Sequence, residues 1–209
     1  MLNQVKQSIL APYGMQEKDI DTIMDSMLSS QVDEADIYFQ SSHFESWVLE
    51  GGIVKEGSHS IEKGAGVRVV SGEKTGFAYS DRIELSVLLE AAKNVKAIAR
   101  QGYNAQRKIA TTATRKDYYQ AISPLKSLAD QEKIDLLRKV DIETRKLDNR
   151  IEEVIVSLVG VDEQILVANQ DGSLAADIRP LTRMSVTVIL EDNGKREQGS
   201  MGGGARTDY

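Results

Sequence analysis

His43 and His59 are the only imidazoles of the chain and the first candidates for chemistry, because histidine is a common metal ligand and general base. Both lie in segments that predict β-strands. A zinc site needs three or four converging ligands, and the sequence has no cysteine and no pair of histidines at helical spacing. We therefore interpret both histidines as polar positions on a half-exposed sheet.

Two Ser-x-x-Lys matches, Ser71–Lys74 and Ser123–Lys126, raise the chemistry in which a lysine activates a serine nucleophile. That chemistry needs a buried lysine at a helix start. The first match is predicted to be a hairpin turn and the second lies in a loop with proline, so neither supports catalysis. The glycine clusters 64–66 and 202–204 lack the Gly-Lys-Ser/Thr continuation of a phosphate-binding loop.

Carboxylates are a third possible source of chemistry. Four glutamates fall in predicted strands and turns: Glu45, Glu50, Glu56 and Glu62. Alternating charge is typical of the solvated face of a sheet. We therefore interpret these glutamates as residues of such a solvated face. A self-sufficient enzyme that uses such carboxylates with Tyr38 or Tyr79 stays open as an alternative.

Arginines and glycines are the remaining candidates, as contact residues for a substrate or partner. Arg179 and Arg183 bracket a proline before the most apolar strand, and Arg68 lies in the corresponding strand of the first half. Guanidinium groups bind carboxylates, so these arginines could hold a peptide carboxylate or a partner's acid; ion pairs with the chain's own acids are the competing interpretation. The triplet Gly202, Gly203 and Gly204 predicts close backbone approach to a segment absent from this chain.

The hydrophobic periodicity predicts an α+β fold, with antiparallel meander sheets and flanking helices. Helices are expected at 1–10, from about 16 with Ile20, Ile23, Met24 and Met27 on one face, after the capping-box pair Asp81 and Glu84, and after the similar pair Ser127 and Asp130. Strands are expected at 35–42, 43–50, 53–61, 66–70, 75–79, 154–160, 164–168 and 184–190.

This order of elements divides the chain into three predicted segments. Residues 1–100 would hold the N-terminal helices, a sheet and a covering helix. Residues 101–121 would be an exposed connector, and 122–209 a second helix with its sheet, ending before a catalytic domain. Both halves repeat a helix, two strands and an apolar strand closed by a polar turn, which suggests an internal structural duplication.

Composition excludes several classes of protein. The net charge of −6 argues against a nucleic-acid or membrane-surface binder, which needs a basic face. No apolar run approaches the length of a membrane span, and the first residues lack the pattern of a secretion signal. The lack of cysteine is compatible with a cytoplasmic protein.

Longer stretches carry a family resemblance. Residues 36–50 (DIYFQSSHFESWVLE) and 64–81 (GAGVRVVSGEKTGFAYSD) resemble the TldD/PmbA family of bacterial metalloproteases, also called modulators of DNA gyrase. Residues 174–186 and 194–206 continue the resemblance, which covers nearly the whole chain and favours the TldD branch.

The resemblance implies a metallopeptidase with one metal ion, zinc, held by a His-Glu-x-x-x-His helix and a later cysteine, whose glutamate activates a metal-bound water. That motif is absent here, so no catalytic or metal-binding residue is assigned and the segment alone is expected to be inactive. The resemblance further implies a PmbA- or TldE-like partner subunit and unfolded or small peptide substrates. Extended peptides suit β-addition to a sheet edge.

A stand-alone peptide-binding or protein-interaction module without catalysis is the alternative to a protease segment. If the chain is the front part of a longer protein, we expect an exposed apolar surface beside the strand 186–190, where further residues would pack.

Overall fold

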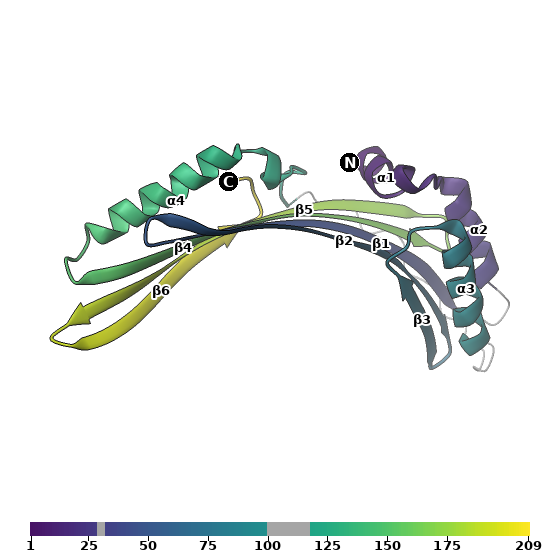
Figure 1. Cartoon of the computed structure of the whole chain (residues 1–209). Helices are drawn as coiled ribbons and strands as arrows, with labels where there is room; N and C mark the ends of the chain where they lie inside the picture. The colour runs from purple at the N-terminus through teal and green to yellow at the C-terminus, as the bar shows by residue number, and fades with distance from the viewer. Residues whose placement is uncertain (29–31, 100–117) are drawn as a thin grey trace. The chain divides into compact units, whose positions relative to one another are not determined.

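The computed structural model describes residues 1–28, 32–99 and 118–209, and it confirms the predicted α+β class (Figure 1). Its elements are α1 (Leu2–Ile9), α2 (Glu17–Met27), β1 (Glu34–Glu50), β2 (Ile53–Ser71), β3 (Lys74–Ser80), α3 (Leu85–Ala99), α4 (Asp130–Arg145), β4 (Ile151–Asn169), β5 (Leu174–Asp192) and β6 (Lys195–Ala205). Most of the predicted connector lies outside the described residues. Among the described helices, none combines the length and the apolarity that crossing a membrane requires.

The six strands form one sheet in the order β3-β2-β1-β4-β5-β6. β3 is antiparallel to β2 with Ser71 opposite Lys74, so this Ser-x-x-Lys match is a hairpin turn as predicted. β6 is antiparallel to β5 with Asp192 opposite Lys195. Asn193 and Gly194 between them have φ of 51° and 77°, the left-handed conformation that a tight two-residue hairpin turn requires.

The strands are longer than the sequence predicted. The segments 35–42 and 43–50 form one strand, β1, and the same is true of the pairs within β2 and β4. In the middle of β1 the alternation of buried and exposed side chains breaks down, over a polar run of half-exposed residues. Backbone pairing with neighbouring strands continues through such a run whatever its side chains, and so the predicted breaks were wrong.

Two helix starts were also predicted wrongly, and the first is that of α3. This helix begins at Leu85, so Asp81 lies outside it and cannot be its cap. Glu84 instead accepts hydrogen bonds from the guanidinium of Arg82 at 2.8 and 3.1 Å. The carboxylate of Glu84, which would accept the backbone hydrogen bond of a capping box, is thus bound by Arg82.

The second is that of α4, whose cap lies two residues after the predicted serine. Ala129 has extended backbone, and its N–H donates to the Glu132 carboxylate at 2.7 Å. Alanine has no side-chain acceptor, so only the acidic half of a capping box is present. The hydroxyl of Ser127 donates to the carbonyl of Pro124 at 2.8 Å instead.

The chain divides into two compact units that share the long strands. The first draws on residues 1–42, 62–117 and 163–178, and the second on 43–61, 118–162 and 179–209. Each unit therefore combines parts of both predicted segments 1–100 and 122–209. The division of the chain into the consecutive segments 1–100, 101–121 and 122–209 stays a prediction.

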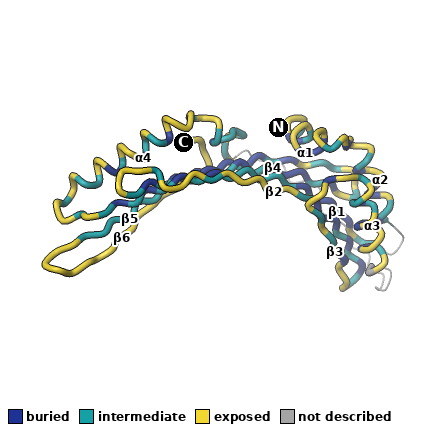
Figure 2. Tube along the Cα trace, in the orientation of Figure 1, coloured by how far each residue is buried: buried dark blue, intermediate teal, exposed yellow. Residues whose placement is uncertain are grey.

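Each unit has its own apolar core, and the buried positions along the chain are dark blue in Figure 2. In the first unit the predicted face of α2 is buried, together with residues from the strands and α3: Ile20, Ile23, Met24, Met27, Ile37, Phe39, Val67, Val69, Leu88, Ala92 and Val95. In the second unit Leu137 of α4 packs on Trp47, Leu49, Val154, Val156 and Leu158. Burying these apolar faces holds helix and sheet together.

The glycine triplet lies in β6, the last strand of the sheet. A β-carbon at Gly202 would lie 2.8 Å from the carbonyl oxygen of Met184, and one at Gly204 only 2.6 Å from that of Thr182. The close approach predicted for these glycines is therefore to the backbone of β5, within the chain itself. Gly203 differs, since a β-carbon there would meet no atom within 4 Å.

Gly204→Ala should lower the free energy of unfolding by about 1–3 kcal/mol, because the new methyl group forces β5 and β6 apart. In the 209-residue chain Gly203→Ala is the matched control and should be close to neutral, since its methyl group meets open space there. Urea unfolding of both variants measures the difference. Equal losses at the two positions would contradict the proposed close approach.

Candidate functional site

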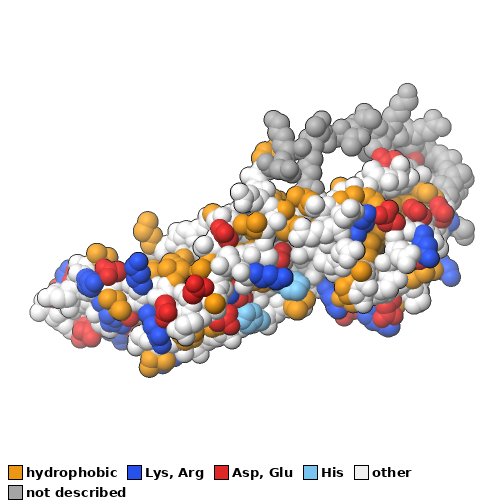
Figure 3. Space-filling view, turned by 90° about the horizontal axis from the view of Figure 1, so that it is seen from above, with side chains coloured by type: hydrophobic (Ala, Val, Ile, Leu, Met, Phe, Trp, Pro, Cys, Tyr) orange, Lys and Arg blue, Asp and Glu red, His pale blue; other side chains and the backbone are white. Residues whose placement is uncertain are grey.

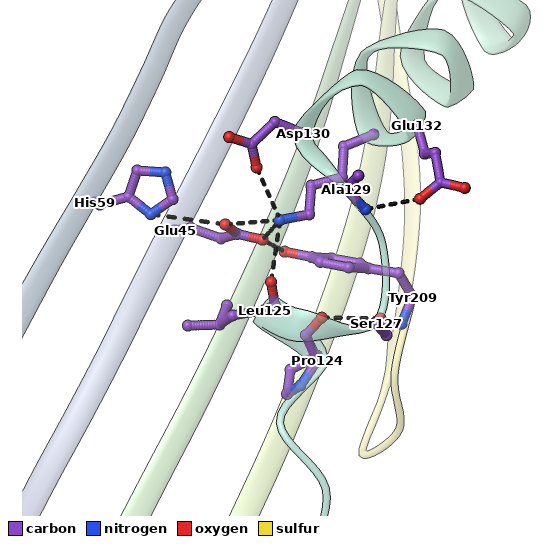
Figure 4. Close-up of polar contacts among 10 residues, drawn as sticks. Glu45, His59, Pro124, Leu125, Ser127, Ala129, Asp130, Glu132 and Tyr209 are labelled. Atoms are coloured by element: carbon purple, nitrogen blue, oxygen red, sulfur yellow. Dashed lines mark hydrogen bonds and ion pairs between the residues drawn. The ribbon is translucent and has the colours of Figure 1, made fainter.

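Lys133 of α4 and Glu45 of β1 form an ion pair in the core of the second unit. Figure 4 shows the polar contacts around Glu45. Each side chain is only 1% exposed, and Nζ lies 2.8 Å from Oε1 and 3.0 Å from Oε2. Nζ also donates to the carbonyl oxygen of Leu125 at 3.2 Å, with a carboxylate oxygen of Asp130 at 3.5 Å. These oxygen partners offset the loss of hydration that a buried ammonium suffers.

Tyr209 completes the pair from the far end of the second unit's chain. Its hydroxyl donates to Oε1 of Glu45 at 2.5 Å, and its backbone N–H donates to the Ser127 hydroxyl at 3.3 Å. Its ring fills the space beside Gly160, where any β-carbon would overlap the phenol oxygen. Burial, followed by the hydrogen bond to Glu45, raises the pKa of Tyr209 well above its ordinary value of 10.0.

His59 closes the outer side of this group. Its Nδ1 lies 3.6 Å from Oε2 of Glu45, and its ring meets Trp47 edge-on with ring centroids 5.9 Å apart. The His59 side chain is 57% exposed, and imidazole groups are visible at the surface among charged side chains in Figure 3. We call Glu45, Lys133 and Tyr209 the buried polar cluster, and His59 lies at its exposed side.

The geometry of the buried polar cluster suits an anchor better than a catalytic centre. A general base needs a lone pair that substrate can reach. Both oxygens of Glu45 are engaged by Lys133 and Tyr209, and the carboxylate is out of contact with solvent. The cluster therefore fixes α4 and Tyr209 to the sheet.

Sequence reasoning missed this cluster and placed Glu45 on the solvated face of the sheet, which is wrong. The strand continues through Glu45 on its buried side, because α4 covers that face. One signal was present in the sequence. Lys133 stands on the same helical face as Leu137 and Val140, and a charge at a core-facing position predicts a buried partner.

Arg68, the first of the predicted contact residues, lies in the first unit and is held by acids of its own chain. Its Nε donates to Asp36 at 2.6 Å and its Nη2 to Glu34 at 2.7 Å. The hydrogen bond to Asp36 is the main cause that raises the pKa of Arg68. Arg68 therefore forms ion pairs with the chain's own acids, which the sequence analysis gave as the alternative to a contact role.

The other predicted contact residues lie in the second unit, on β5 and β6. Arg179 is half-buried in β5, whereas Arg183 is exposed and stands opposite Gly204 in the ladder. Gly202, Gly203 and Gly204 are all exposed. The structure thus brings Arg183 and the glycines together at the outer strand of the sheet, and their contact role stays a prediction.

The described residues do not fit the zinc ion that the resemblance implies. Across 1–28, 32–99 and 118–209, no three histidine, cysteine or acidic side chains come together as a metal-binding group. His59 has a single acidic neighbour, Glu45, which Lys133 already neutralises. We therefore assign no step of a metal-dependent reaction to these residues.

Lys133→Met should lower the free energy of unfolding by roughly 3–5 kcal/mol, because Glu45 then keeps a buried charge without its ammonium partner. The double variant Lys133→Met with Glu45→Leu should recover most of that loss. Lys139→Met on an exposed position of the same helix is the control and should be nearly neutral. If denaturant unfolding finds Lys133→Met and Lys139→Met alike, the ion pair does not anchor α4.

The raised pKa of Tyr209 predicts a loss of stability at alkaline pH. Above pH 10.0 the unfolded chain releases the phenol proton that the native state retains, so the free energy of unfolding falls as pH rises further. Below that pH the group contributes no slope. Tyr209→Phe should flatten the alkaline decline, whereas Tyr118→Phe, at a side chain 84% exposed, should leave it unchanged. Thermal unfolding at a series of pH values tests this.

Comparison with known proteins identifies the family. Sequence models of two domains match: PmbA/TldA metallopeptidase domain 1 over residues 35–99, and the PmbA/TldA metallopeptidase central domain over 123–209. A metalloprotease TldD homolog of Haemophilus influenzae is 49% identical over 208 residues, which are 99% of this chain and 43% of that protein. A TldD homolog of Buchnera aphidicola from Acyrthosiphon pisum is 42% identical over 98% of the chain and 42% of its own length.

Solved structures share the fold. A candidate modulator of DNA gyrase from Bacteroides thetaiotaomicron superposes with a TM-score of 0.73 at 18% identity, over 91% of this chain and 45% of that one. TldE from Thermococcus kodakarensis has a TM-score of 0.65 at 15% identity, over 91% and 43%. The chain spans less than half the length of these relatives. From the matched domains and the sequence identity, the chain belongs to the PmbA/TldD metallopeptidase family.

Proposed function

We propose that this chain is the N-terminal part of a TldD-like zinc metallopeptidase subunit acting on unfolded or small peptides. The metal and its ligands would belong to residues that follow Tyr209 in the longer protein, so the 209-residue segment alone would be inactive. The segment would guide an extended peptide and contact a second subunit of PmbA or TldE type. A cytoplasmic location without nucleic-acid or membrane partners is part of the same proposal.

The observation that carries the peptide-binding role is the state of β6. It is the last strand in the sheet, and each of its eleven residues is exposed. Its inner edge pairs with β5, and no strand of the described chain pairs with its outer edge. An unpaired edge is a template on which an extended peptide can add a strand through backbone hydrogen bonds, with little dependence on sequence.

The register of the hairpin determines which backbone groups of β6 face outward. Asp192 and Lys195 flank a two-residue turn and so form a hydrogen-bonded pair of the ladder. Such pairs alternate along antiparallel strands, which makes Val186 and Met201 hydrogen-bonded to each other. The N–H of Ser200, one residue earlier, is therefore directed away from β5 and toward an added strand.

The side chains near this edge are consistent with a peptide partner. Gly202, Gly203 and Gly204 present bare backbone, which allows another chain to approach closely. The exposed guanidinium of Arg183 stands beside Gly204 and could bind a carboxylate of the peptide or of the partner subunit. The name of the TldE structure among the fold relatives supports the choice of partner type.

Ser200→Pro in the full-length subunit, assayed with zinc and its partner subunit, should slow hydrolysis of an unstructured peptide by roughly 10-fold or more. Proline removes the outward N–H at an edge position while leaving the β5 ladder intact. Ser200→Ala is the matched control and should retain full activity. Equal rates for both variants would exclude strand addition at β6.

The isolated 209-residue chain with zinc serves as the second control, and we expect no cleavage from it. Cleavage by that chain would exclude the proposed location of the metal site. The alternative of a stand-alone interaction module predicts that the longer protein with zinc also fails to cleave the peptide, while binding at β6 persists.

A further inference from the structure

From α2 and α4 onward the two halves of the chain repeat one topology, and they differ after the third strand. Each runs through a helix, two long strands and a shorter third strand: α2-β1-β2-β3 and α4-β4-β5-β6. In the sheet order β3-β2-β1-β4-β5-β6, the first strand of each half (β1 and β4) lies at the centre. The second and third strands of each half follow toward the two edges. In the first half, a further helix, α3, follows the third strand.

In the first unit, α3 completes the cover of the sheet. It packs on β3 and beside α2, and the strand residues beneath the helices are fully or almost fully buried, with Ala65 at 3% and Val67 and Val69 at 0% exposure. The contact is tight, since a β-carbon at Gly76 would lie 2.6 Å from the carbonyl oxygen of Val95.

Helices α2 and α3 of the first unit lie with their C-terminal ends together. Lys96, near the end of α3, donates from Nζ to the carbonyl oxygens of Ser26 at 3.0 Å and Leu28 at 2.6 Å, which lie at the end of α2. α3 therefore starts where the chain leaves β3 and ends beside the end of α2.

The second unit lacks this cover at the equivalent positions. Aligning the pair Ser71–Lys74 with the pair Asp192–Lys195 makes Ala65, Val67 and Val69 equivalent to three residues of β5, namely Val186, Val188 and Leu190. All three are half-exposed. The repeat thus places apolar side chains where a second helix would bury them.

An open groove of about 800 Å³ lies at the same place in the second unit. It is lined by Thr144 in the last turn of α4, by Leu147 just after that helix, and by apolar residues of β5. Gly199, Gly202 and Gly203 of β6 contribute bare backbone. Leu147 and Met201 are apolar yet 82% and 84% exposed.

We propose that this groove is occupied, in the longer protein, by an amphipathic helix formed by the residues that follow Tyr209. It would lie on β5 and β6 beside α4, as α3 lies on β3 beside α2. This occupant is favoured by chain order, because α3 directly follows β3 and the counterpart would directly follow β6. It is also favoured by the relatives, since this chain matches only 43% of the Haemophilus influenzae protein's length.

The position of Tyr209 gives the helix its direction. Tyr209 is held beside the start of α4 through Ser127 and Glu45, and the groove is lined by Thr144 and Leu147 at the other end of α4. A helix that begins after Tyr209 would therefore run parallel to α4, as α3 runs with α2. A helix of the length of α3, 15 residues, spans about 22 Å, close to the length of α4, which has 16.

The first test places a photoreactive residue at position 147 of the full-length protein. Illumination of the monomer should crosslink it to the same chain within about 30 residues after Tyr209, the length of a short connection and one helix. A crosslink to a second copy, to the partner subunit or to a distant part of the chain would overturn the proposal.

The second test measures stability in the same full-length protein. Leu147→Glu should lower Tm by roughly 4 °C or more, because a charge then faces an apolar helix. Ile142→Glu is the matched control, on an α4 side chain that is 53% exposed and outside the groove, and should leave Tm almost unchanged. Equal shifts in both variants would contradict a covered groove.

These readouts are independent of peptidase activity. A crosslink to the residues after Tyr209 supports the helix even if Ser200→Pro shows that β6 does not bind peptide. Conversely, an active enzyme whose position 147 crosslinks elsewhere retains the proposed function and excludes the helix.

Discussion

The ion pair between Lys133 and Glu45 determines how the second unit is assembled. Both charges are out of water, so α4 can lie on the sheet only where the ammonium meets the carboxylate; sliding the helix would leave two buried charges unpaired. Tyr209 joins the same carboxylate and fits against Gly160. The path of the chain after β6 is therefore tied to the beginning of α4 by one shared interaction.

The two units differ in how far helices cover the apolar face of the sheet. In the first, α3 packs on β3 beside α2, and Ala65, Val67 and Val69 on that face of β2 are buried. In the second, α4 is the one α-helix among the described residues, and the apolar side of β5 remains half-exposed. Because burial of apolar area is the main favourable term in folding, the same strand topology without a counterpart of α3 leaves a surface that favours an additional packing partner.

The outer edge of β6 and the face of β6 therefore bind different kinds of partner. Its outer edge offers backbone groups to an extended chain, whereas its face offers Met201 and bare glycine backbone to a helix, beside the apolar side chains of β5. Family membership rests on matched domains and on close sequence identity to TldD homologs. The distant solved structures, below 20% identity, add the fold alone.

The sequence by itself determined the elements and the family. Local periodicity predicted the buried face of α2, turn residues predicted the hairpins at Gly51 and Asn193, and long motifs identified the relatives. These features depend on neighbours along the chain, which a sequence displays directly. The lengths of β1 and β4 were underestimated because pairing with adjacent strands, which involves distant residues, carries a strand through polar runs.

Only the tertiary structure decided the fate of individual polar residues. Glu45 and Glu56 both lie within strands of the sheet, yet Glu45 is buried with Lys133 and Glu56 is exposed. The difference arises because α4, about 90 residues later in sequence, covers one position and not the other. Burial is a property of what packs against a residue, and that partner is chosen by the fold.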